Sequence, residues 1–206
     1  DALEMKDYGN QAAEAGLVFL VTGEAMYAKT ALALIEQSLA FYHDCYANEK
    51  PVNWYSSSRI NALAAYDWIF NTLTPEHRKS LGASFLQAVE QVQPTTERHY
   101  FYPQENWSGT TTGFYGNRSL LWYAGLAMFG EDIDPRAEWF LAEGYRLNNE
   151  LLAHRRRCAG DDGGSATASL NYAMAAYPWS VFNYFHTYRS ATGKNIALDW
   201  PHVSYL

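Results

Sequence analysis

Apolar residues recur every three or four positions along most of this 206-residue chain, which is the spacing of an amphipathic α-helix. The clearest stripe, over residues 24–46, consists of Ala28, Ala31, Leu32, Ile35, Leu39 and Tyr42. The best alternating pattern, at residues 99–102, is too short to compete as a strand. The chain is therefore predicted to fold as an all-α protein.

Start and stop signals divide this helical pattern into segments. Thr74–Pro75 and Asp134–Pro135 each combine a capping side chain with a proline at the beginning of a helix. Gly23, Gly130 and Gly193 each follow an apolar stretch and precede a charged residue, a pattern typical of a helix end. These three similar ends predict a recurring helical hairpin.

The signals predict seven helices, over residues 11–22, 24–46, 56–68, 75–93, 120–129, 135–152 and 169–192. Two long polar segments rich in glycine, at 93–117 and 160–165, separate some of them. Antiparallel helix pairs with both long loops on one side favour an incomplete (α/α) toroid. We expect residues 1–206 to form a single toroid domain that is a segment of a longer chain.

Composition narrows the classes of function. A net charge of -7 argues against nucleic acid and anionic membrane surfaces as partners, and no apolar run approaches the roughly 20 residues of a membrane span. Cys45 and Cys158 lie too far apart for metal-site spacing and are expected to be small core residues. The histidines show no ligand spacing either, so the sequence predicts no metal and no cofactor.

Aromatic residues are abundant, with 16 Tyr, 7 Trp and 10 Phe. Those on helical stripes are expected in the core, and they include Tyr42, Trp68, Phe85, Trp139 and Phe182. The others gather in residues 100–115 and 172–179, in or beside the predicted loops. Because aromatic rings stack on sugars, these segments indicate a carbohydrate groove, with Trp107, Tyr115 and Trp179 as candidate binding residues.

Several motifs along the chain resemble those of heparinase II/III-like and alginate-lyase-like polysaccharide lyases. Residues 64–69 and 73–78 resemble a "YDW" helix that leads through "LTPEER" into its antiparallel partner. Residues 126–131 resemble the "LALxGE" helix end of that family, and residues 162–172 resemble its "DGGxxxGxxY" loop. The similarity extends over residues 14–201, and it depends on the order of the motifs.

The resemblance implies an (α/α) toroid that acts on an acidic, uronic-acid-containing polysaccharide or oligosaccharide by β-elimination. It also implies a bacterial enzyme in the periplasm or outside the cell. This chemistry requires a group that neutralises the uronate carboxylate, and a base and an acid that move protons. The present chain would supply the amino-terminal side of the toroid.

The same resemblance assigns catalytic residues. Asn106 corresponds to the carboxylate neutraliser, while Trp107 stands where the family has a histidine. Tyr172 corresponds to the proton-transferring tyrosine with a small offset, and Tyr177 and Tyr184 compete for that role. A turn residue that bonds its own backbone is the alternative for Asn106, and a core aromatic is the alternative for Tyr172.

The residues themselves add further candidates. His99 lies among aromatic residues of the first long loop and is the best catalytic histidine, whereas the helical histidines are expected in surface or packing roles. Asn117 and Arg118, at the other end of that loop, form a polar pair for substrate binding. The basic run at 154–157 fits either a helix end or a contact with an acidic polysaccharide.

Two other functions stay open at this point. The chain could be a helical carbohydrate-binding or scaffold domain without catalysis, a hypothesis favoured by Trp107. It could also be a toroidal glycoside hydrolase, which needs two carboxylates across the sugar. Glu105 with Asp161 or Asp162 is the pair on suitable loops.

Overall fold

The computed structural model describes residues 7–48, 50, 57–93, 119–159 and 177–200, without the side chains of residues 154, 155, 158, 159 and 177–180. The described residues form helices and no strand, which confirms the predicted all-α class. The α-helices within these described residues are α1 (Tyr8–Thr22), α2 (Ala25–Ala47), α3 (Ser57–Ile69), α4 (Pro75–Gln91), α5 (Leu120–Met128), α6 (Arg136–Ala159) and α7 (Tyr177–Thr192). Short 3-10 helices lie at Phe70–Thr72 and Ala197–Asp199.

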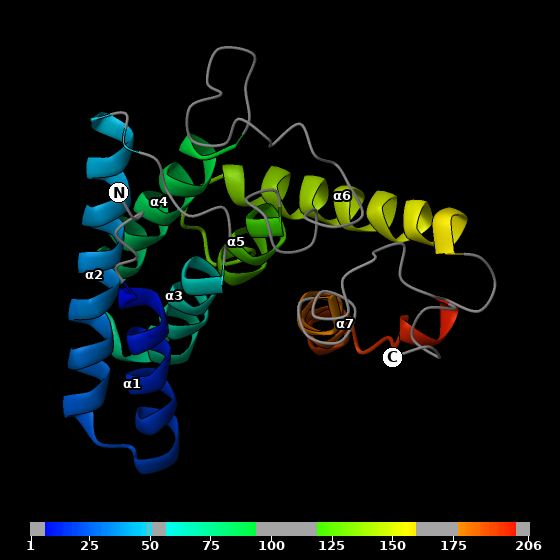
Figure 1. Ribbon diagram of the computed structural model, residues 1–206. Coiled ribbons are helices and arrows are strands. Elements are labelled where there is room, and N and C mark those ends of the chain that lie inside the picture. Colours follow the sequence, from blue (N-terminus) through cyan, green and yellow to red (C-terminus); the bar gives the residue numbers. More distant parts are fainter. Residues whose placement is uncertain (1–6, 49, 51–56, 94–118, 160–176, 201–206) are drawn as a thin grey trace.

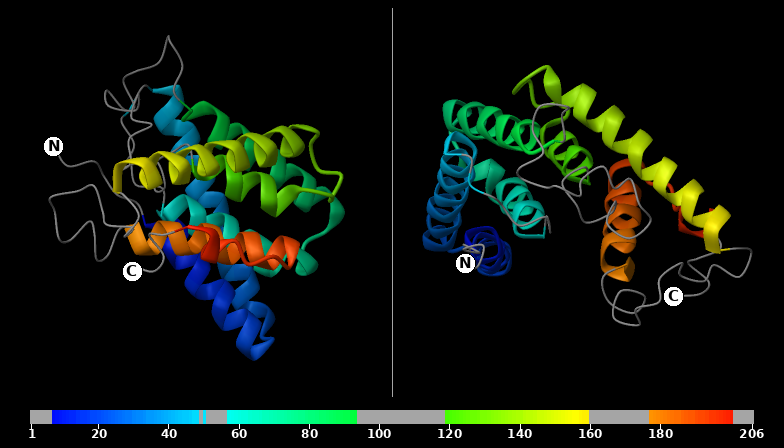
Figure 2. Two further views of the ribbon diagram at one scale, coloured as in Figure 1. Left: turned by 90° about the vertical axis from the view of Figure 1, so that its right-hand side faces the viewer. Right: turned by 45° about the horizontal axis from the view of Figure 1, so that its top comes forward.

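The helices pack in two rows (Figures 1 and 2). Contacts run from α1 to α3 and from α3 to α5, while α2 contacts α4. Helix α1 also packs against α2, and α5 packs against α6, so sequential helices form hairpins that connect the rows. In the right view of Figure 2, α2, α4 and α6 follow one another on one side, with α1, α3 and α7 on the other.

Several of the predicted helix starts and ends have the expected capping geometry in the structure. The Thr74 Oγ1 accepts a hydrogen bond from the backbone N–H of His77 at 3.2 Å, which caps α4. Gly23, Gly130 and Gly193 have φ angles of 72°, 81° and 73°, a left-handed conformation that favours glycine. The predicted recurring helix end is therefore confirmed at all three positions.

The predicted apolar face of α2 is also confirmed, but the prediction that Trp139 of α6 lies in the core is wrong. Ala28, Ala31, Ile35 and Leu39 are buried in the core. In α6, by contrast, Trp139 is 56% exposed, and the buried stripe consists of Ala137, Phe140, Gly144, Leu147 and Leu151. This second stripe also has helical spacing. It is the buried one because its glycine, Gly144, lets α6 approach α5 closely.

Helices α5 and α6 approach each other closely through two glycines. A Cβ atom on Gly144 would lie 2.3 Å from the backbone nitrogen of Trp122, and one on Gly125 would lie 2.3 Å from the backbone nitrogen of Leu141. Since backbone atoms cannot move aside as a flexible side chain can, only glycine fits at either position. The two glycines therefore fix how closely α6 packs on α5.

The α3–α4 hairpin is braced by two residues of the motif that resembles the lyases. The hydroxyl of the fully buried Tyr66 donates to the carbonyl oxygen of Arg78 at 3.0 Å. The Arg78 Nε–H donates in turn to the carbonyl oxygens of Phe70 and Leu73, at 3.0 and 3.1 Å. These bonds satisfy two carbonyls in the connection between α3 and α4 and one in the first turn of α4, so Tyr66 and Arg78 have a structural role.

Replacing Gly144 with alanine tests the close helix crossing. Alanine normally stabilises a helix interior by about 1 kcal/mol relative to glycine, but here the added methyl group would meet backbone, and we expect a loss of about 1–3 kcal/mol. The free energy of unfolding in urea measures the change. Gly16→Ala is the matched control, because its nearest contacts are the Trp68 ring at 3.2 Å and the Ala65 Cα at 3.6 Å. Equal effects of the two substitutions would contradict the proposed constraint.

Candidate functional site

Most of the predicted site residues lie outside the described residues. These are His99, Glu105, Asn106, Trp107, Tyr115, Asn117, Arg118, Asp161, Asp162 and Tyr172. Trp179 lies in α7, but its side chain is not described, and the same holds for Tyr177. Tyr184, the remaining alternative for the catalytic tyrosine, is 1% exposed and packs against Trp122, so that alternative is wrong.

A groove of about 630 Å³ lies between α3, α5 and α7. Its apolar surface comes mainly from Ile60, Leu63, Ala64, Trp68, Leu126, Ala127 and Ala191. Its polar lining consists of Asn61 and Asp67 from α3, Tyr123 from α5, and Asn183, Thr187 and Ser190 from α7. This mixture of aromatic, amide and hydroxyl groups around an apolar surface is typical of a small-molecule binding site.

Helix α7 is held in place along the groove by a hydrogen bond to α5. The indole Nε1–H of Trp122 donates to the Thr187 Oγ1 at 2.9 Å, and the Thr187 hydroxyl donates to the carbonyl oxygen of Asn183 at 2.8 Å. The Trp122 ring also makes an edge contact with Tyr184, with ring centroids 5.2 Å apart. These contacts fix the direction in which α7 presents its polar residues.

Asp67 is the ionisable carboxyl group among the residues that line the groove. Its side chain keeps contact with solvent, but its partial burial raises the pKa of the carboxyl, and the negative charge of Glu131 raises it further. Glu131 lies in the turn after α5 and also raises the pKa of Tyr66, after burial as the larger cause. The α3 end of the groove is therefore an electronegative environment.

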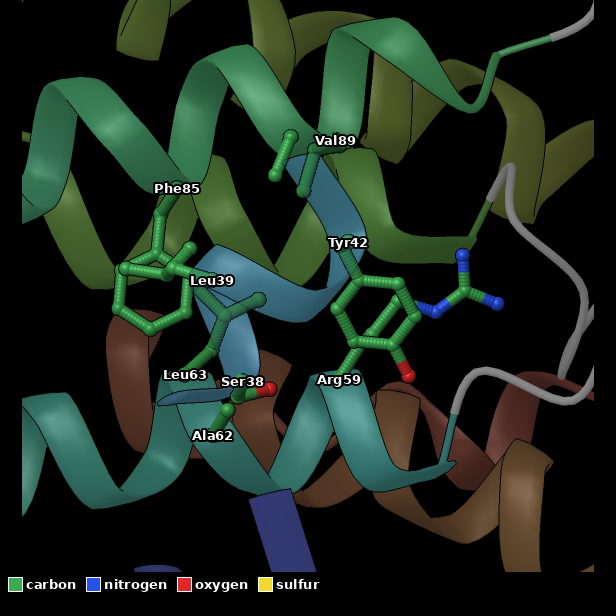
Figure 3. A pocket seen from close by; sticks show the side chains of 9 residues that line it. Ser38, Leu39, Tyr42, Arg59, Ala62, Leu63, Phe85 and Val89 are labelled. Carbon is green, nitrogen blue, oxygen red and sulfur yellow. The ribbon is translucent and has the colours of Figure 1, made fainter. Parts of the chain in front are cut away.

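A second cavity, between α2, α3 and α4, is much smaller. Its volume of about 20 Å³ corresponds to about one water molecule. Figure 3 shows Arg59 beside the Tyr42 ring, with 5.2 Å between the guanidinium carbon and the ring centroid. The cavity cannot hold a sugar, so the groove is the candidate site.

The helical histidines that the structure describes do not line this groove. His43 is half-buried and joins α2 to α4, with Nδ1 3.1 Å from the Gln91 Oε1 and Nε2 2.9 Å from the Ser84 Oγ. His77 and His186 are exposed, so the predicted surface and packing roles are confirmed for these three. Cys45 is buried as predicted.

Neither a metal cluster nor a membrane-spanning helix is present among the described residues. No group of three or more His, Cys, Asp or Glu side chains among them is arranged to hold a metal ion. Within the same residues, every helix is too short or too polar to cross a membrane.

Comparison with known protein families, with curated proteins and with solved structures found no match to this chain. The groove and its side chains therefore carry the functional argument.

The residues that line the groove were not predicted from the sequence, although a signal for part of the lining is present. Asn183, Thr187 and Ser190 follow each other at spacings of four and three on α7, and Asn61, Ala64 and Trp68 follow each other at spacings of three and four on α3. The polar residues at helical spacing on α7 indicate a solvent-facing surface of that helix. Trp68, which was expected in the core, lies at the edge of this surface and is half-buried.

Replacing Asp67 with asparagine tests the electronegative environment. Because folding raises the Asp67 pKa from 3.8, the ionised carboxyl opposes folding, and this cost develops as the pH rises through the unfolded and folded pKa values. We expect Asp67→Asn to stabilise the protein at pH 7 by on the order of a few tenths of a kcal/mol, since water screens a partly exposed charge. The gain should vanish below about pH 3.5.

Urea unfolding at several pH values measures this difference. The exposed Glu36 of α2 provides the control, as Glu36→Gln also removes one negative charge but lies away from the groove. The variant and the unsubstituted protein are compared at each pH. If Asp67→Asn lowered the free energy of unfolding at pH 7 relative to the unsubstituted protein, and did so more than at pH 3.5, the interpretation would be contradicted.

Proposed function

We propose that the chain is the helical part of a polysaccharide lyase of the heparinase II/III-like type, and that the groove between α3, α5 and α7 binds the sugar chain. The observation that carries this proposal is the groove itself, which combines a tryptophan ring with amides and hydroxyls from three helices. Sugars present apolar ring faces and many hydroxyl groups, so they match such a lining.

The helix arrangement supports an incomplete (α/α) toroid. In a ring of hairpins, alternate helices form an inner row whose exposed faces surround a common space. Helices α1, α3 and α5 contact each other in this alternating order, and the groove lies on α3, α5 and α7. The substrate would therefore bind to the inner row.

The resemblance to the lyases supplies the proposed reaction. Asn106 would neutralise the uronate carboxylate, and Tyr172, with His99, would move the proton beside it and the proton to the leaving 4-oxygen. Asn117 and Arg118 would bind the acidic substrate, and Trp107, Tyr115 and Trp179 would stack on its rings. The enzyme would act in the periplasm or outside the cell.

Trp68 lines the groove, so its substitution tests whether the groove binds sugar. Its ring packs against α1 beside Gly16, which gives a fixed surface for a sugar. We expect Trp68→Ala to weaken the binding of uronic-acid-containing oligosaccharides about tenfold or more, equivalent to about 1.4 kcal/mol, as measured by titration calorimetry. Trp139→Ala is the matched control, since Trp139 is exposed and does not line the groove. Equal affinities of the two variants would exclude the groove as the binding site.

The lyase reaction has its own test. In the full-length enzyme, Tyr172→Phe is expected to abolish formation of the unsaturated uronate, which absorbs ultraviolet light, because phenylalanine cannot transfer a proton. Binding of the oligosaccharide should persist in this variant. Unchanged turnover would overturn the role of Tyr172, and binding by the unsubstituted protein without any product would favour the non-catalytic carbohydrate-binding function.

A further inference from the structure

The end of the α1–α2 hairpin extends past the helices that it packs against (Figures 1 and 2). Helices α1 and α3 lie side by side and run in the same direction. Gly9 of α1 lies against Ser58, at the start of α3. Gly16 lies against Ala65, nearer the end of α3, which comes at Ile69. In this register the last turn of α1 lies beyond the end of α3.

Apolar side chains cover this protruding end, which we call the apolar tip. Its members are between 37 and 79% exposed, and they are Leu17, Val18, Leu20 and Val21 of α1 and Met26 of α2. A fully exposed side chain of this kind presents on the order of 100 Å² of apolar surface, so the five together expose roughly 300 Å². An exposed apolar patch of this size often has a function.

Two copies of the apolar tip together have the area of a reversible interface. Contact between them would bury about 600 Å² of apolar surface, and since apolar atoms make up about 60% of such interfaces, the total would be about 1,000 Å². Specific interfaces begin at about this size, and those at the lower limit associate reversibly. Because the tip protrudes, a second copy reaches it before it meets the other helices.

Charged residues at the two edges of the apolar tip complement each other. Glu14 lies one turn before the tip on α1, and Lys29 lies one turn after Met26 on α2. Both are exposed, and neither forms an ion pair within the described part of the chain. Glu24 lies in the turn at the very end of the hairpin, so contact between the sides of two hairpins leaves it in water. The α1 edge is therefore acidic and the α2 edge is basic.

We propose that the apolar tip is the interface of a reversible two-fold dimer of this chain. In a two-fold interface each contact occurs twice, with the roles of the two copies exchanged. Packing the α1 edge of one hairpin along the α2 edge of the other covers both apolar surfaces and pairs Lys29 with Glu14 of the partner subunit at both ends. No residue of the tip lines the groove between α3, α5 and α7, so the dimer does not depend on the proposed function.

Sedimentation velocity of the protein over about a hundredfold range of concentration tests this dimer. We expect the sedimentation coefficient to rise from the monomer value to the dimer value as the concentration increases. Val21→Lys should weaken the dimer about tenfold or more, because it places a charge on the most exposed residue of the tip, while a lysine in the last turn of a helix favours folding. Leu198→Lys is the matched control, since Leu198 is 83% exposed and lies outside the tip.

The edge charges test how the two copies are arranged. At low salt, Glu14→Lys and Lys29→Glu should each weaken self-association about fivefold, since each substitution brings like charges together at both ends of the interface. A mixture of the two variants restores both pairs of opposite charge. We therefore expect the mixture to form heterodimers with about the affinity of the unsubstituted protein.

Three results would overturn the proposed interface. These are a protein that stays monomeric over the whole range of concentration, a dimer that Val21→Lys leaves intact, and an equal effect of Val21→Lys and Leu198→Lys. A mixture of the two charge variants that associates no better than either alone would overturn the two-fold arrangement. The methyl NMR signals of the apolar tip in the unsubstituted protein provide a test without substitution, because they should shift with concentration while those of Leu198 stay in place.

Discussion

The close approach of α5 and α6 at Gly125 and Gly144 is the constraint on which the rest of the structure depends. The backbone nitrogen that faces Gly144 belongs to Trp122, whose indole N–H holds Thr187 of α7. The next residue, Tyr123, lines the groove. The contact at Gly144 sets the distance between α5 and α6. The same turn of α5 carries Trp122, which holds α7, and Tyr123, which lines the groove, so the positions of both residues depend on this contact.

This arrangement explains how packed helices can keep a polar groove between them. Each helix of the groove buries one face against its hairpin partner or a neighbouring helix and leaves another face toward the groove. Apart from the buried Tyr123, the polar residues on that face are at least partly exposed, so they do not cost the free energy of burying polar groups without partners. The environment of Asp67 raises the pKa of its carboxyl, and such perturbed groups concentrate at functional sites.

The sequence predicted what local chemistry determines. Helix starts at Thr74 and ends at Gly23 follow from capping and backbone conformation, which involve only neighbouring residues. The buried face of α6 could not be predicted in this way, because two stripes have helical spacing and the choice depends on the backbone of α5. The groove was missed for the same reason: Asn61 and Asn183 are far apart in sequence, and only packing brings them to one surface.

The most direct test of the account is an NMR titration of the indole N–H signals with a uronic-acid-containing oligosaccharide. The account places the ligand between α3, α5 and α7, beside Trp68, while Trp139 lies exposed on α6 and away from the groove. We predict that the Trp68 signal shifts progressively as the oligosaccharide is added, and that the Trp139 signal stays in place. A titration that shifts Trp139 and leaves Trp68 unchanged would contradict the account.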